Sequence, residues 1–229
     1  MTKHPRAVAP DGPSGSGRSQ TIDYRVQDGK LYGVGDKGGV YTLKPNTAAA
    51  TKVSQLGVAL QGTAFGVDFN PAADRLRVVS NTGQNLRHNV NADGTTLADT
   101  TLTYPPVATP AAGVTAAAYT NNDLDTDTAT TLYDIDTASD QVALQSPANS
   151  GQLAAVGKLG VDATGDAGFD IHSSLRNGRA ADATGYAVLR VGQGTAVYRI
   201  SLVTGRADRL GALPTTWQVA DLAVGLQKY

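Results

Sequence analysis

The chain has 229 residues, with 19 basic and 20 acidic side chains, so its formal net charge is −1. A nearly neutral chain has no field that attracts nucleic acid or an anionic membrane surface, and neither is an expected partner. The absence of cysteine excludes disulfides, zinc–thiolate sites and thiol nucleophiles. No apolar run reaches the roughly 20 residues that cross a bilayer, so no membrane span is expected.

The chain begins with a segment that is poor in strand formers. Residues 1–20 are rich in Gly, Ser and Pro, which predicts a flexible tail before a single domain over residues 21–229. The tail carries basic residues but no apolar segment, so we do not expect a complete signal peptide in it. Its GPSGSG stretch lacks the Lys-Ser/Thr pair of a phosphate-binding loop, which favours a linker.

A strand-like phrase then recurs about every 45 to 52 residues, a spacing typical of propellers and solenoids. Its five occurrences read TIDYR, GVDFN, AAAYT, GFDIH and VADLA. The same position of the phrase is occupied by Asp23, Asp68, Ala118, Asp170 and Asp221. We expect each phrase to be the first strand of a repeated unit.

Three further strand signals follow within each of the first four units. They are short, rich in Val, Leu, Tyr and Thr, and bounded by Gly, Asn, Asp or Pro, and no segment keeps a helical period. This pattern predicts an all-β protein, a β-propeller of four-stranded blades. It predicts five blades, the last one incomplete because the chain ends soon after VADLA. The unclosed blade edge would then favour self-association.

Several of these segments together resemble a known family. They are GTAFGVDFNPAADRLRVVSNTGQNLR, AAAYTNN, TTLYDIDT, GQLAAVGKLGVD and GFDI, and the likeness runs over roughly residues 22–226. The family is DUF4394, a bacterial domain of unknown function. The resemblance implies a propeller fold and a secreted protein with an extracellular or cell-envelope location, but no chemistry. Family members begin with an extra strand region, which this sequence replaces with its Gly/Ser/Pro tail.

The most polar stretch of the domain is VDFNPAADRLRVVSNTGQNLR, residues 67–87. In a strand, Arg75 and Arg77 lie on one face, and after the turn Arg87 belongs to the same polar surface. Such a cluster is either a salt-bridge and amide framework between blades or a site for an anion or a sugar. The candidate ligand-binding residues in this stretch are Asp68, Asn70, Arg75, Arg77, Asn81, Gln84, Asn85 and Arg87.

The repeated aspartates form a second candidate site. Asp68 and Asp170 would face the propeller axis, where a ring of acids either holds a cation or accepts backbone N–H groups in a neighbouring loop. Tyr119 and Asn121 fall near the end of an inner strand. They either line the mouth of a central channel or satisfy turns.

The stretch NNDLDTDTATT places Asp123, Asp125 and Asp127 at alternate positions. This spacing imitates the first half of a calcium loop, but the central Gly and the terminal Glu of such loops are missing. A solvated acidic loop is the alternative. No cofactor other than calcium is expected.

Two functions stay open at this point. The first is an extracellular-type binding or scaffold module whose polar Arg/Asn/Asp face takes a small molecule, a glycan or a protein. The alternative is a metal-assisted lyase or hydrolase with its site at the propeller axis, built from Asp68, Asp170 and Tyr119. No nucleophile motif surrounds any serine, so no catalytic residue is assigned.

Overall fold

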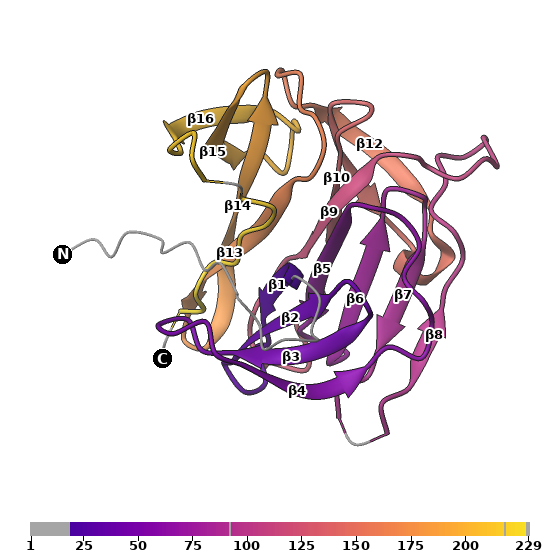
Figure 1. Ribbon diagram of the computed structural model, residues 1–229, viewed down its shortest axis with the longest axis vertical. Coiled ribbons are helices and arrows are strands. Elements are labelled where there is room, and N and C mark those ends of the chain that lie inside the picture. Colours follow the sequence, from indigo (N-terminus) through magenta and orange to yellow (C-terminus); the bar gives the residue numbers. More distant parts are fainter. Residues whose placement is uncertain (1–18, 92, 218, 228–229) are drawn as a thin grey trace.

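The computed structural model describes residues 19–91, 93–217 and 219–227. These residues form four antiparallel four-stranded sheets that follow one another around a common centre (Figure 1). The prediction of an all-β propeller with four-stranded blades is therefore confirmed. The predicted number of blades was five, whereas the described residues build four complete ones. They contain no helix that is long and apolar enough to cross a membrane.

Each blade is built from consecutive strands, innermost first. Blade 1 consists of β1 (Ser19–Tyr24), β2 (Leu31–Gly35), β3 (Gly39–Leu43) and β4 (Ala50–Gln55). Blade 2 consists of β5 (Phe65–Asn70), β6 (Arg75–Ser80), β7 (Asn85–His88) and β8 (Thr96–Ala98). Blade 3 consists of β9 (Val114–Tyr119), β10 (Leu132–Asp136), β11 (Gln141–Gln145) and β12 (Leu153–Lys158). Blade 4 consists of β13 (Gly168–Arg176), β14 (Arg179–Val191), β15 (Gly194–Ile200) and β16 (Ala207–Ala212).

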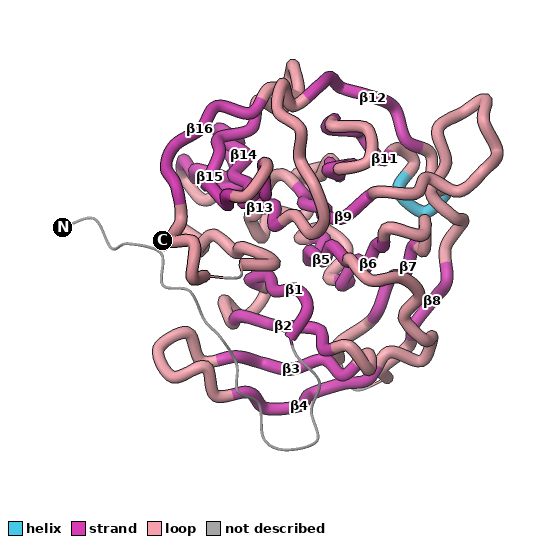
Figure 2. The backbone as a smooth tube through the Cα atoms, turned by 45° about the horizontal axis from the view of Figure 1, so that its top comes forward, coloured by secondary structure: helices cyan, strands magenta, loops and turns pink. Residues whose placement is uncertain are grey.

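The recurring phrase is the inner strand of each blade. Figure 2 shows β1, β5, β9 and β13 around the centre, and β4, β8, β12 and β16 at the rim. Short strands are joined by tight turns whose glycines adopt the left-handed region, such as Gly38 at φ 72° and Gly83 at φ 83°. Glycine occupies this region at little steric cost, so these turns set the register of each hairpin.

The hydrophobic core lies between the blades. Val34 and Phe69 belong to the cluster between blades 1 and 2, and Val79 and Ala117 to the cluster between blades 2 and 3. A third cluster joins blades 3 and 4. A lone sheet of this size would leave its apolar faces in water, and packing face against face around a centre removes them from it.

The last described segment continues the ring without forming a sheet. A Cβ added to Gly66 would lie 2.5 Å from the backbone nitrogen of Ala117, so β5 and β9 approach each other closely. Gly168 has the same relation to the backbone nitrogen of Leu222, also at 2.5 Å. Residues 219–226 therefore stand beside β13 in the place of the next inner strand, as the repeat predicted, although they are not paired as a strand.

Candidate functional site

Three buried carboxylates meet where the inner strands converge. Asp23 on β1, Asp68 on β5 and Asp170 on β13 each place an oxygen within 4.8 Å of the oxygens of the other two. They are only 6%, 2% and 3% exposed, respectively. The repeat explains this meeting, because each aspartate occupies the same position of its inner strand. We call these three residues the axial carboxylates.

The axial carboxylates also join neighbouring inner strands. The backbone N–H groups of Tyr24 and Phe69 donate to the two oxygens of Asp23, at 2.6 and 2.8 Å. Ile171 N–H and Val224 N–H divide the oxygens of Asp170 in the same way. Asp23 and Asp170 thus accept backbone N–H groups, as predicted, but the donors lie in the inner strands and the last segment and not in a neighbouring loop.

Asp221 repeats this arrangement in the last segment. It accepts the N–H of Ile22 at 2.7 Å and the hydroxyl of Thr21 at 2.6 Å, which ties the segment to blade 1. In blade 3 the equivalent residue is Ala118, which has no such group. There the hydroxyl of Ser173 accepts the N–H of Asn121 at 2.9 Å, so a side chain of blade 4 supplies a link between the two blades.

Burial raises the pKa values of the aspartates in this cluster. It raises the pKa of Asp23 and of Asp68 well above the usual range, and the neighbouring carboxylates add to the effect. The pKa of Asp170 rises to about 6 and that of the half-buried Asp221 to about 7, again chiefly through desolvation. Carboxylates this close cannot all carry a charge unless something neutralises them. The cluster therefore favours proton uptake, and its oxygens are of the kind that a cation takes as ligands.

The arginine at the centre of the polar stretch belongs to a framework. Arg77 is 3% exposed, and its guanidinium donates to Asn85 and Asp99 at 2.7 Å each. It also donates to Asn149 at 2.7 Å and to the Tyr119 hydroxyl at 3.3 Å. Four partners in blades 2 and 3 leave this side chain no direction toward a ligand. Of the two interpretations of the cluster, the framework between blades describes Arg77, Asn85 and Tyr119.

Four other predicted residues satisfy the backbone of turns. Asn70 accepts two N–H groups in the turn that follows β5. Asn81 accepts the N–H of Thr63 at 3.0 Å, and Gln84 accepts one backbone N–H and donates to a backbone carbonyl. Asn121 donates to a carbonyl in its own loop. These contacts explain the amide side chains without a ligand.

The acidic loop packs against blade 4. Asp123 accepts the N–H of Ala180 at 2.7 Å, and Asp125 pairs with Arg179. Arg179 lowers the pKa of Asp125 through this bond. Asp125 also accepts the N–H of Asp127 at 2.9 Å. The loop thus already has cationic and N–H partners, and calcium binding by these three aspartates stays a prediction.

An open pocket on blade 2 contains the remaining arginines. Its volume is about 170 Å³, and its lining consists of Arg75, Arg87, Asn89, Asp93, Thr95 and Leu97. Arg77 on β6 and Arg87 on β7 are register partners and therefore lie on one face of blade 2. Arg75 lies on the same face, because it is two residues before Arg77 in the strand. We call this the blade 2 pocket.

The guanidinium groups of the blade 2 pocket are held in place but not saturated. Nη1 of Arg75 donates to the carbonyls of Ala73 and Asp74, at 3.3 and 2.8 Å. Nε of Arg87 donates to both oxygens of Asp99 at 2.9 Å. Among the described residues, their other N–H groups have no hydrogen-bond acceptor. They remain available to an anion.

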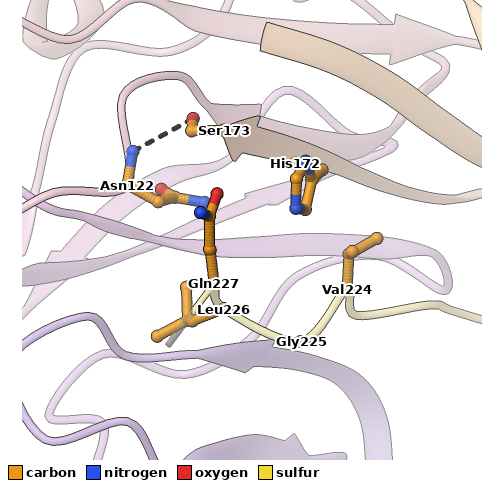
Figure 3. Close-up of a pocket in the computed structure, with 7 residues that line it drawn as sticks. All are labelled: Asn122, His172, Ser173, Val224, Gly225, Leu226 and Gln227. Atoms are coloured by element: carbon orange, nitrogen blue, oxygen red, sulfur yellow. Dashed lines mark hydrogen bonds between the residues drawn. The ribbon is translucent and has the colours of Figure 1, made fainter. Parts of the chain in front are cut away.

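A smaller pocket lies where blade 4 meets the last segment (Figure 3). Its lining consists of Asn122, His172, Ser173, Val224, Gly225, Leu226 and Gln227. Ser173 directs its hydroxyl toward the loop of Asn122, whose N–H donates to it at 3.1 Å. His172 lines the same pocket, and among the described residues no hydrogen bond joins it to Ser173. This pair does not have the arrangement of a nucleophile and its base.

Sequence reasoning missed the residues that surround Arg77. Asp99 lies in the loop after β8 and Asn149 in a short 3-10 helix (Ala148–Ser150), and no spacing rule connects them to β6. Asp134 on β10 is fully buried, and neither of its oxygens has a hydrogen-bond partner among the described residues. Burial raises its pKa well above the usual range, while Arg77 acts in the opposite direction. The available signal was the position of Asp134 in β10, two residues after Leu132 and therefore on the same face as this apolar residue.

Comparisons with known proteins give the family but no activity. The family model described as "Domain of unknown function (DUF4394)" matches residues 11–223. No curated protein matches the chain significantly.

Among solved structures, a structural genomics protein of unknown function from Bacteroides thetaiotaomicron VPI-5482 is similar, with a TM-score of 0.54 and 12% identity. The match covers 92% of this chain and 55% of that one. A protein from Lactobacillus plantarum has a TM-score of 0.43 and 18% identity, over 91% of this chain and 60% of its own. Kuenenia stuttgartiensis hydrazine synthase has a TM-score of 0.45 and 12% identity, over 93% and 53%.

This chain thus spans little more than half the length of each of these structures. At such low identity the first likeness concerns the fold alone. The family match extends from the tail to the last segment and includes every blade. The chain therefore belongs to the DUF4394 family, a domain of unknown function.

Proposed function

We propose that this propeller is a binding module that takes a small oxyanion-bearing molecule in the blade 2 pocket. The observation that carries the proposal is the pair of guanidinium groups, Arg75 and Arg87, in an open pocket of about 170 Å³. Each is held at one edge by an oxygen acceptor and keeps N–H groups for a ligand. Carboxylates and phosphates are the groups that arginine binds best. An extracellular or cell-envelope location stays a prediction from the family resemblance.

Removing both arginines is expected to weaken anion binding at least tenfold. Each charge-assisted hydrogen bond contributes about 1.5 to 3 kcal/mol, so losing the pair affects affinity by one order of magnitude or more. The measurement is isothermal titration of wild type and the Arg75→Ala/Arg87→Ala variant with citrate, inorganic phosphate and D-galacturonate. At least one of these anions should bind to wild type and be lost from the variant.

The matched control is Arg209→Ala, because Arg209 is an exposed arginine on β16, far from the pocket in the chain. It should bind like wild type. Arg75→Ala alone removes only bonds to backbone carbonyls and keeps the Arg87–Asp99 pair. It tests the pocket if the double variant folds poorly. Wild type that binds none of the three anions, or variants that bind as well as wild type, would contradict the proposal.

A second candidate function is supported by the axial carboxylates. Three buried carboxylate oxygens within 4.8 Å of one another are ligands of the kind that calcium prefers. Neither of the two pockets described above is lined by Asp23, Asp68 or Asp170. We therefore propose a cation that holds the inner strands together, rather than the metal-assisted lyase or hydrolase that the sequence left open.

Calcium is expected to raise the melting temperature of chelator-treated protein by about 5 to 10 °C at saturating concentration. Binding at a hundredfold excess over Kd contributes about 2.7 kcal/mol, and each kcal/mol corresponds to about 2 to 4 °C for a chain of this size. Thermal unfolding with CaCl₂ and with EDTA measures the effect. Asp68→Asn should abolish it.

Two variants of the acidic loop separate the two calcium hypotheses. Asp125→Asn should leave the calcium effect intact if the ion binds at the axis, and should remove it if the ion binds in the loop. Asp127→Asn removes a second carboxylate of the same loop and should give the same answer. The surface control is Asp36→Asn, because Asp36 is exposed in the turn between β2 and β3, outside both candidate sites. A melting temperature that responds to neither calcium nor EDTA would remove the cation from both places.

A further inference from the structure

The blade 2 pocket contains more than its two arginines. Asn89, Asp93 and Thr95 line it as well. The Asn89 amide donates to one oxygen of Asp93 and thereby holds this carboxylate in place, while the N–H of Asn91 donates to Asn89 at 3.1 Å. Among the described residues, the second oxygen of Asp93 and the hydroxyl of Thr95 have no hydrogen-bond partner. The pocket therefore offers acceptors as well as the guanidinium donors.

A carboxylate in an anion pocket restricts the ligand. Asp93 repels any negative charge beyond the one that the arginines neutralise, which disfavours dianions such as hydrogen phosphate. It accepts hydrogen bonds from hydroxyl groups instead. The matching ligand has one acidic group and several hydroxyls.

The third side of the blade 2 pocket, after the guanidinium donors and the acceptors, is apolar. Leu97 on β8 is 47% exposed and is the register partner of Arg87, so an aliphatic side chain stands beside the guanidinium. The pocket volume of about 170 Å³ is below the roughly 300 to 1,000 Å³ of pockets for drug-sized molecules, which limits the ligand to about one small ring. The C–H face of a sugar ring has the size and polarity to cover Leu97.

From these donors, acceptors and apolar side chain we infer that the ligand of the blade 2 pocket is a sugar acid of the uronic type. Its carboxylate pairs with Arg75 and Arg87, its hydroxyls donate to Asp93 and Thr95, and its C–H face covers Leu97. This inference rests on the proposed binding function and specifies the class of ligand.

The test compares three probes by isothermal titration on the full chain: D-galacturonate, D-galactose and inorganic phosphate. We expect galacturonate to bind at least tenfold more tightly than galactose, which lacks the carboxylate, and than phosphate, which lacks the hydroxyls and the ring. Asp93→Asn should weaken galacturonate about tenfold and strengthen phosphate, since it removes the repelling charge. Circular dichroism verifies that this exposed turn position leaves the fold intact.

The outcomes separate the two levels of the proposal. If phosphate binds through Arg75 and Arg87 as tightly as galacturonate, and Asp93→Asn changes neither affinity, the uronic class is wrong and the anion pocket stands. If galactose equals galacturonate, the carboxylate has no role and the inference is overturned. If none of the anions binds, the inference and the proposed function fail together.

Discussion

Arg77→Ala is expected to destabilise the protein by about 3 to 5 kcal/mol. The substitution removes the cation of a buried ion pair and leaves the neutral partners of Arg77 without a hydrogen-bond donor. Arg77 and Asp99 are 3% and 5% exposed and lie 2.7 Å apart. Without the guanidinium, the side-chain oxygens of Asn85 and Asn149 lose a donor. Thermal unfolding should show a loss of about 6 to 20 °C, at about 2 to 4 °C per kcal/mol for a chain of this size.

Arg199→Ala is the matched surface control. Arg199 is 58% exposed and lies 3.9 Å from Asp208, and such a pair contributes about 0 to 1 kcal/mol. Its melting temperature should stay within a few degrees of wild type. An Arg77→Ala protein that melts like wild type would mean that the guanidinium does not hold blades 2 and 3 together, and the ligand interpretation of Arg77 would return.

In cation-free protein, the axial carboxylates are expected to make the fold less stable as the pH rises from about 4 to 7. Their pKa values are raised in the folded state, so this contribution is fully present below the ordinary value of 3.8 and is lost as the pH rises through the folded value. For Asp170, the rise from 3.8 to about 6 corresponds to roughly 3 kcal/mol. Asp221, with a folded pKa of about 7, extends the window to neutral pH.

Asp68→Asn provides the comparison, because the amide imitates a protonated acid and removes one repelling charge. The variant should be more stable than wild type at pH 7 in EDTA and should lose less stability between pH 4 and 7. His88 acts with the opposite sign, since burial lowers its pKa and its contribution is lost as the pH falls. It is common to both proteins and cancels in the difference. Parallel pH profiles of melting temperature would show that the cluster does not titrate as a unit.

The sequence predicted the architecture well because period and turn chemistry are local. The recurring phrase placed all four inner strands, and its fifth copy located the segment that follows blade 4. It predicted an incomplete fifth blade with one inner strand, but residues 219–227 are not paired as a strand, since strand pairing depends on partners that a repeat count cannot supply. The alternation in β6 placed Arg75 and Arg77 on one face, as the register shows.

The candidate site was harder to predict, because it depends on which side chains the fold covers. Arg75 and Arg77 are two positions apart on one face, yet one lines an open pocket and the other is buried against blade 3. The difference depends on Asp99 and Asn149, which bind Arg77 but not Arg75 and come from a loop and a short 3-10 helix with no fixed spacing from β6. The sequence suggested amide side chains such as Asn81 as ligand donors, but in the structure they form hydrogen bonds with the backbone of turns.

The hydrogen bonds between Asp221 and blade 1 affect how the protein folds. Thr21 and Asp221 are 200 positions apart, whereas each blade otherwise packs on the one before it. A stack of units with neighbour contacts alone would fray from either end. Closing this contact couples the first unit to the last, at the entropic cost of a very long loop. We therefore expect this contact to form late in folding, and to make the stability of the first blade depend on the last segment.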